Sequence, residues 1–267
     1  MQMAMAVLMA LAAVPRVTPA PKQAAVAAPR PRVEVAFVLD TTGSMGDELV
    51  YLERELENLW YQVQRTYPES EQRWALIAYR DEGDNYVHVP FDFTADVDEY
   101  LGVLEALEAE GGGDEPEASD QALRDLEALS WRSDPATARV AFWFSDAPHH
   151  AERSEEFAIA LSEAKDLGVK LYPVASENAS ALTVHTMRTA AQITGGRYLF
   201  LLGDHPAASA GPLRCYYVTE LNALLLRVVR VEMDGRYRAP TIESLLGVNG
   251  PLIDGRCESE LGPITAF

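Results

Sequence analysis

The chain has 267 residues, of which 48% are apolar, and its formal net charge at pH 7 is −19. A chain of this size can bury a core of its own, and about 200 residues remain between an unusual N-terminus and a short tail, which is the length of one domain. The part from residue 33 onward holds 18 basic and 41 acidic residues and carries a charge of −23, because residues 1–32 contain four basic residues and no acid. Such an acidic body repels nucleic acid and attracts cations. We therefore expect no nucleic-acid partner.

Residues 1–32 form a leader that differs from the rest of the chain. Residues 4–14 are an unbroken apolar run, too short to cross a bilayer, and a small-residue stretch follows it. This order is typical of a signal peptide, although no basic residue precedes the run. We predict export, with a secreted or periplasmic protein as the product, and cytoplasmic retention as the alternative. We expect no transmembrane segment.

From residue 33 onward, the chain alternates between apolar strands and amphipathic helices. Residues 33–39 and 140–144 are apolar at nearly every position, as in strands covered on both faces, while apolar residues recur at helical spacing from Leu49 to Val63. The predicted elements are a strand at 33–39, a helix at 46–63, strands at 74–79 and 86–91, helices at 97–107 and 116–129, a strand at 140–144, a helix at 153–167, a strand at 169–175, a helix at 181–193, a strand at 197–202 and a helix at 219–231. Pro90 favours an edge position for its strand, and Pro116 suits the first turn of its helix.

This alternation predicts the α/β class, with a doubly wound, mostly parallel Rossmann-like sheet and helices on both faces. We divide the chain into the leader at 1–32, one domain at 33–231, and a tail at 232–267 that shows no periodicity. Cys215 and Cys257 are the two cysteines. In an exported protein we expect them to form a disulfide, whereas two separate buried thiols are the alternative.

Polar residues follow two of the predicted strands. Asp40, Thr42 and Ser44 come after the first strand, and Asp146 comes after the strand at 140–144. Ligands of doubly wound sheets bind beyond the carboxyl ends of the strands, where the strand order reverses. If these two strands are neighbours at that point, two carboxylates and two hydroxyls converge there. Hard oxygen donors of this kind suit Mg²⁺ or Mn²⁺.

A third polar segment is the tight acidic loop GGGDEPE at 111–117. Asp114 in this loop is a further candidate metal ligand. In the alternative interpretation, Asp114 and Glu117 only favour the start of the following helix. Thr42 and Ser44 have a similar alternative role as caps of the helix that follows them. The combination of all three polar segments favours the metal site.

At these residues the chain resembles the von Willebrand factor A domain and its metal-ion-dependent adhesion site, whose motif is D-x-[ST]-x-S. Here the motif reads Asp40-Thr41-Thr42-Gly43-Ser44. The stretches DTTGSM, GGGDEPEA, SDAPHH and GGRYLFL are together similar to a bacterial branch of that family. The resemblance covers about residues 33–231.

The resemblance implies a fold that binds one Mg²⁺ or Mn²⁺ through Asp40, Thr42, Ser44 and Asp146. It also implies a partner protein, one of whose acidic residues completes the coordination of the metal. The family loop usually supplies a threonine hydroxyl where this chain has Asp114. A third carboxylate would hold the metal more firmly and accept an acidic partner less readily. The expected function is a non-enzymatic, divalent-cation-dependent protein-binding module.

Two other functions remain open at this point. The first is a cytoplasmic regulatory or scaffold domain that acts on a separately encoded partner such as a kinase, because DTTGSM and SDAPHH also resemble domains that accompany alpha-type kinases. The second is a phosphatase of the haloacid-dehalogenase type, whose nucleophilic aspartate also ends a first strand. That type has a second aspartate where this chain has Thr42, and its GDxxxD motif is absent here. The phosphatase is therefore the weaker alternative.

Overall fold

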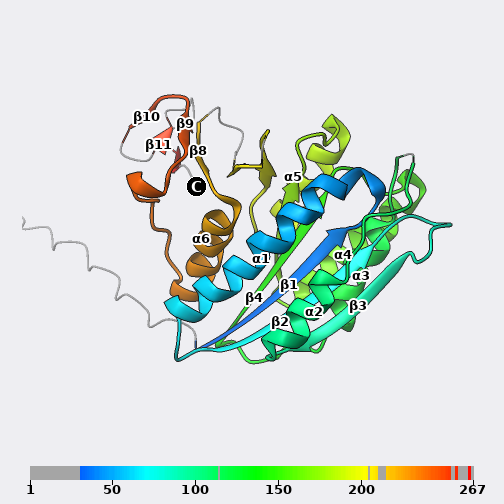
Figure 1. The fold of residues 1–267 in the computed structure, drawn as a ribbon, viewed down its shortest axis with the longest axis horizontal. Helices are drawn as coiled ribbons and strands as arrows, with labels where there is room; N and C mark the ends of the chain where they lie inside the picture. The colour runs from blue at the N-terminus through cyan, green and yellow to red at the C-terminus, as the bar shows by residue number, and fades with distance from the viewer. Residues whose placement is uncertain are drawn as a thin grey trace, which may run out of the picture.

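The computed structural model describes residues 31–113, 115–203, 205–209, 215–253, 256–257 and 264–265. In this part of the chain, nine strands form one sheet in the order β3-β2-β1-β4-β5-β6-β7-β8-β9 (Figure 1). The strands are β1 (Arg32–Asp40), β2 (Glu71–Tyr79), β3 (His88–Thr94), β4 (Thr137–Ser145), β5 (Lys170–Ala175), β6 (Leu199–Leu201), β7 (Ala207–Ala208), β8 (Tyr216–Thr219) and β9 (Gly247–Asn249). The helices are α1 (Gly46–Thr66), α2 (Val97–Glu105), α3 (Ser119–Ala128), α4 (Ser154–Asp166), α5 (Ala181–Thr194) and α6 (Leu221–Asp234). A small second sheet contains β10 (Leu252–Ile253), β11 (Arg256–Cys257) and β12 (Ile264–Thr265).

The centre of the large sheet is parallel. Strands β2, β1, β4, β5 and β6 pair in parallel, whereas β3 at one edge and β7, β8 and β9 at the other pair antiparallel. The chain places β2 on one side of β1 and later β4 on the other, so the strand order reverses between β1 and β4. The predicted fold class is confirmed. Strands β1 and β4 are neighbours, so the condition on which the two predicted carboxylates converge is met.

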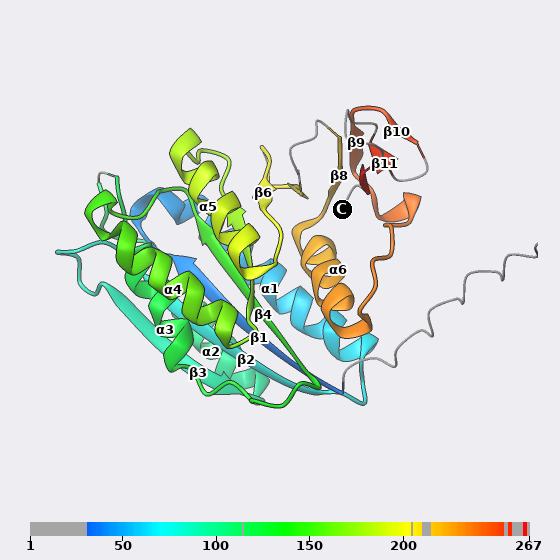
Figure 2. The ribbon, with the colours of Figure 1, turned by 180° about the vertical axis from the view of Figure 1, so that it is seen from behind.

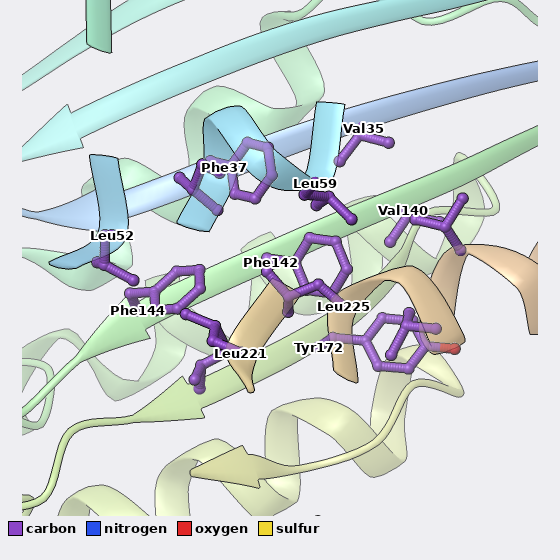
Figure 3. Packing of buried hydrophobic residues seen from close by; sticks show 14 of the residues in the cluster. Val35, Phe37, Leu52, Leu59, Val140, Phe142, Phe144, Tyr172, Leu221 and Leu225 are labelled. Carbon is purple, nitrogen blue, oxygen red and sulfur yellow. The ribbon is translucent and has the colours of Figure 1, made fainter. Parts of the chain in front are cut away.

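Two hydrophobic layers cover the faces of the sheet. Because successive side chains of a strand point to opposite faces, β1 contributes to both layers. Val35 and Phe37 pack with α1, α2 and α6, and Figure 3 shows Phe37 and Phe142 on that face with side chains of α1 and α6 around them. Ala36 and Val38 pack with α3, α4 and α5 on the opposite face, which Figure 2 shows from behind. The sheet is therefore buried on both faces, so a binding site has to lie at the ends of its strands.

One predicted helix begins later than expected. The proline at the start of 116–129 favoured a helix from that residue, but α3 begins at Ser119. The backbone of Glu117 instead joins the segment after β4, because its N–H donates to the carbonyl of Pro148 (3.0 Å) and the residue forms a bridge with His149. This tertiary pairing takes Glu117 out of the helix, and α3 begins two residues later.

The C-terminal part adds strands that the sequence did not predict. Strand β6 is shorter than the predicted 197–202, β7 and β8 precede α6, and β9 in the tail pairs with β8 at the edge of the large sheet. Each has two to four residues, which is too short for a recognisable period. Cys215, just before β8, is disulfide-bonded, while the side chain of Cys257 lies outside the described part. None of the described helices is long and apolar enough to cross a membrane.

Candidate metal centre

The end of β1 holds the first part of the site. Asp40 is the last residue of the strand and is fully buried. One of its carboxylate oxygens accepts hydrogen bonds from the backbone N–H (3.0 Å) and the hydroxyl (2.6 Å) of Thr42, and the other accepts from the hydroxyl of Ser145 (2.9 Å). The aspartate thus links the loop after β1 to the end of β4.

The hydroxyl of Thr42 is directed at this carboxylate, and the hydroxyl of Ser44 is directed at Thr42 rather than at the helix. Thr42 is fully buried, and its hydroxyl lies 3.1 Å from the hydroxyl of the exposed Ser44. Thr42 precedes a short 3-10 turn (Gly43–Met45) that leads into α1, yet neither the turn nor α1 receives a side-chain capping bond. Thr42 and Ser44 therefore do not cap the helix, and this alternative interpretation is wrong.

The end of β4 supplies the second carboxylate. Asp146 directly follows this strand, and its Oδ1 is buried without a hydrogen-bond partner. The pKa of Asp40 is raised to about 6 as the net result of opposing causes. Burial raises it most, the hydrogen bonds from Thr42 and Ser145 lower it, and the charge of Asp146 raises it. Two carboxyl groups thus lie near each other at the point where the strand order reverses.

The glycine loop closes over the motif. The backbone N–H of Gly43 donates to the carbonyl of Gly111 (3.2 Å), and a side chain at Gly112 would lie 3.0 Å from the Cβ of Thr42. Gly112 also has a positive φ of +67°, so glycine is required there by both space and backbone conformation. The predicted ligand Asp114 lies outside the described residues.

Glu117 is a site residue that the sequence placed only at a helix start. Its side chain is 2% exposed, and Oε2 has no hydrogen-bond partner. Burial, and then the charges of Asp40, Asp81 and Asp146, together raise its pKa to about 9. The one sequence signal was its position in the acidic loop, because the pairing with the segment after β4 becomes visible only in three dimensions.

A second layer of contacts supports the loops. His150 Nε2 lies 2.6 Å from Asp81 Oδ1, and the carboxylate of Asp84 accepts a hydrogen bond from the backbone N–H of Gly112 (3.0 Å). The backbone N–H of Asp81 also donates to Asp84 (3.2 Å). The loop after β2 therefore connects the segment after β4 to the glycine loop.

The donor set fits a hard divalent cation. Among the described residues, no three His, Cys, Asp or Glu side chains gather closely enough to hold a metal ion by themselves. The cluster instead combines the carboxyl groups of Asp40 and Asp146 with the hydroxyls of Thr42 and Ser44. Mg²⁺ is usually held by one or two carboxylates with further oxygens and water. The unpartnered Oδ1 of Asp146 is an oxygen that such a cation would satisfy.

Comparisons with known proteins identify the family of the domain. A sequence profile of the von Willebrand factor A domain matches residues 34–200, well over half of the chain. The chain therefore belongs to the von Willebrand factor A domain family, and this membership supports a protein-interaction module in general terms.

Individual relatives match only part of the chain. It is 36% identical over 94 residues to von Willebrand factor A domain-containing protein 7 of Homo sapiens, which is 35% of this chain and 10% of that protein. It is 30% identical over 118 residues to an ariadne-like RING finger protein of Acanthamoeba polyphaga mimivirus, which is 44% of this chain and 11% of that protein. The chain thus matches about a tenth of the length of these relatives. The solved structure of the conserved hypothetical protein BatB from Bacteroides thetaiotaomicron has a similar fold, with a TM-score of 0.50 and 16% identity, over 63% of this chain and 90% of that one.

Proposed function

We propose that the domain binds a partner protein through a divalent cation, Mg²⁺ or Mn²⁺, held at the ends of β1 and β4. Thr42 and Ser44 would hold the metal through their hydroxyls, and Asp40 and Asp146 through their carboxylates, with Asp114 still a predicted additional ligand. The cation would supply an open coordination position for an acidic side chain of the partner. The observation that carries the proposal is the unpartnered carboxylate oxygen of Asp146, beside Asp40, at the reversal of strand order.

The hydrogen bonds of Asp40 and the exposure of Ser44 both support the proposed metal binding. Asp40 already accepts hydrogen bonds on both of its oxygens, so it orients Thr42 and Ser145 and would reach the metal through water. Ser44 is exposed, so the site opens to a partner at that side. The function is binding rather than catalysis, and the leader predicts that it takes place outside the cytoplasm. N-terminal sequencing of the mature protein tests export, and a chain retained in the cytoplasm from Met1 would support the regulatory alternative.

A thermal-melt experiment tests the metal centre. EDTA-treated protein is melted across a titration of MgCl₂ and, separately, of MnCl₂. A ligand at 100 times its Kd stabilises a fold by about 2.7 kcal/mol, which corresponds to a rise in Tm of about 5–10 °C for a domain of this size. Asp146→Ala and Thr42→Val should lose this rise, whereas Thr42→Ser should keep it because it keeps the hydroxyl.

The outcome separates a metal site from a structural turn. If wild type and Asp146→Ala gain the same Tm from saturating metal, the motif is not a metal centre. A pull-down with Mg²⁺ and with EDTA then tests the partner, since proteins captured through the metal should be lost in EDTA and with Asp146→Ala.

A further inference from the structure

A groove lies next to the candidate metal centre, between α2 and the strands β2 and β3. Its volume is about 660 Å³, within the range of sites that bury most of a drug-sized ligand. Figures 1 and 2 both show α2 beside these strands. The groove borders the site through Tyr86, whose hydroxyl lies 2.6 Å from that of Thr41, and through Glu110, whose N–H donates to the carbonyl of Thr41 (3.1 Å).

The walls of the groove are apolar and its rim is acidic. Apolar side chains of α2 and of strands β2 and β3 line it, and Phe91 is 37% exposed. The acidic side chains of the lining are all exposed: Asp98, Glu99, Glu108 and Glu110. The positive charge among them belongs to Arg80, which is 3% exposed, packs over the ring of Tyr86 and donates to the carbonyl of Glu108 (2.7 Å). A ligand that enters therefore meets apolar walls and negative charge.

Gly102 keeps the groove open. It lies inside α2, where glycine costs about 1 kcal/mol relative to alanine. A Cβ at this position would have no heavy atom within 4 Å, and the backbone has no positive φ, so neither a close approach nor a turn requires glycine. Because Gly102 lines the groove, a side chain there would take up ligand space instead. Packing does not require a glycine at position 102, and the space that it leaves in the groove supports a binding role.

Arg80 adds a polar feature to the floor. Its Nε is buried and has no hydrogen-bond partner. A small shift of this side chain would present the N–H to a backbone carbonyl of a bound chain. The floor therefore suits a peptide better than a purely hydrocarbon ligand.

We propose that this groove binds an apolar, basic segment of the partner protein, with two or three apolar side chains inside and Lys or Arg at the acidic rim. This inference rests on the proposed function in that it takes the ligand to be a protein. It adds that the groove beside the metal centre, and not the metal itself, determines which partner binds. The charge of the rim excludes an acidic segment from this position.

Isothermal titration calorimetry with unlabelled capped peptides tests the proposal. The probe is Lys-Leu-Phe-Leu-Lys, and its controls are Glu-Leu-Phe-Leu-Glu, which reverses the charge, and Lys-Ser-Gly-Ser-Lys, which removes the apolar groups. Wild type should bind the probe with a Kd below about 1 mM and both controls at least about tenfold more weakly. Absence of binding at that concentration, or equal binding of the acidic peptide, would overturn the proposal.

A groove-filling variant locates the binding. Gly102→Trp should weaken probe binding at least about tenfold. Leu182→Trp places the same side chain at an exposed position of α5 (59% exposed) and should leave binding unchanged. Gly102→Trp keeps every acidic residue, so if it still binds the probe like wild type, the attraction is only to the overall acidic surface and the proposal fails.

A second variant covers the case in which Gly102→Trp does not fold, as judged by circular dichroism. Asp98→Asn combined with Glu108→Gln neutralises two exposed rim charges and should weaken probe binding roughly fivefold. Unchanged binding would refute the basic partner.

All titrations are run in EDTA and repeated with Asp146→Ala, where binding should persist. If wild type binds the peptide but shows no metal-dependent rise in Tm, the metal centre alone is refuted. If wild type shows that rise but does not bind the peptide, the groove alone is refuted.

Discussion

Asp40 and Asp146 have different structural roles, although both are acidic residues at strand ends. Asp40 is fully buried and accepts three hydrogen bonds, two from Thr42 and one from Ser145. Asp146 leaves Oδ1 without a partner. A buried acceptor that holds three donors contributes to the fold, whereas an unpartnered carboxylate near another carboxyl group costs stability unless a cation is bound.

This difference predicts opposite effects of two substitutions in EDTA. Asp40→Ala should lower the free energy of unfolding by about 1–3 kcal/mol, because it leaves buried donors of Thr42 and Ser145 without an acceptor. Asp146→Ala should leave this free energy unchanged or raise it, because it removes a charge near Asp40. Urea denaturation of both variants measures the effect, and Asp47→Ala, at an exposed acid of α1, is the control. Equal destabilisation by both variants would contradict the distinction.

The residues of the site differ in how well the sequence revealed them. Asp40, Thr42 and Ser44 lie within five positions, so local spacing was enough to group them. Asp146 was found because the ends of parallel strands share one edge of a sheet. Glu117 was not recognised as a member of the cluster, because a hydrogen bond to the carbonyl of Pro148 positions it, and sequence does not show such a contact.

At the scale of elements, the buried Glu34 joins β1 to β2 and to the loop before β4. Glu34 of β1 is 0% exposed and pairs with Arg73 of β2, whose Nε donates to it (2.9 Å). Arg132, in the loop before β4, donates its backbone N–H to the same carboxylate (2.9 Å). These contacts join β1, β2 and the connection to β4 at the end of the sheet opposite the site. They help set the register in which β1 and β4 bring their carboxyl ends together.

We predict that Glu34→Ala lowers the free energy of unfolding by about 2–4 kcal/mol. Breaking a fully buried ion pair typically costs about 3–5 kcal/mol, and the partly exposed arginines recover some hydration. Glu71→Ala is the matched control, since Glu71 is 58% exposed and also pairs with Arg132, and it should cost less than about 1 kcal/mol. Guanidinium denaturation gives both values. A loss at Glu34 no larger than that at Glu71 would show that the buried pair does not hold the sheet together.

Long periodic elements were predictable, and short ones were not. The helix from Gly46 and the strands at 33–39 and 140–144 are long enough for their apolar period to identify them. The start of α3 was predicted too early, because its preceding residues pair with another part of the chain. Strands β7, β8 and β9 exist because a neighbouring edge offers hydrogen bonds, so their sequence carries little signal.

At the scale of the whole molecule, the acidic residues 33–267 and the leader at 1–32 bear on where the protein functions. Residues 33–267 hold 18 basic and 41 acidic residues, and their net charge of −23 favours solubility and attracts divalent cations. Disulfides such as the one at Cys215 persist in oxidising compartments, and the predicted export would place the protein in one. Residues 215–257 include β8, α6 and β9, so a bridge to Cys257 would tie the last helix of the core to the tail.

We predict that the exported protein, purified without reductant and unfolded in guanidinium, has no free thiol. The predicted bridge closes a loop of 41 residues between positions 215 and 257, for which the chain-entropy model gives roughly 4 kcal/mol, less any strain in the folded state. Reduction should therefore lower Tm by about 8–16 °C, and by less where strain offsets the gain, and Cys215→Ser should lower it equally without reductant. Reductant should have no effect on the double variant Cys215→Ser with Cys257→Ser, which controls for other actions of the reagent. Two thiols per chain in the unreduced protein would rule the bridge out, and the tail would then be held to the domain by β9 and its pairing with β8.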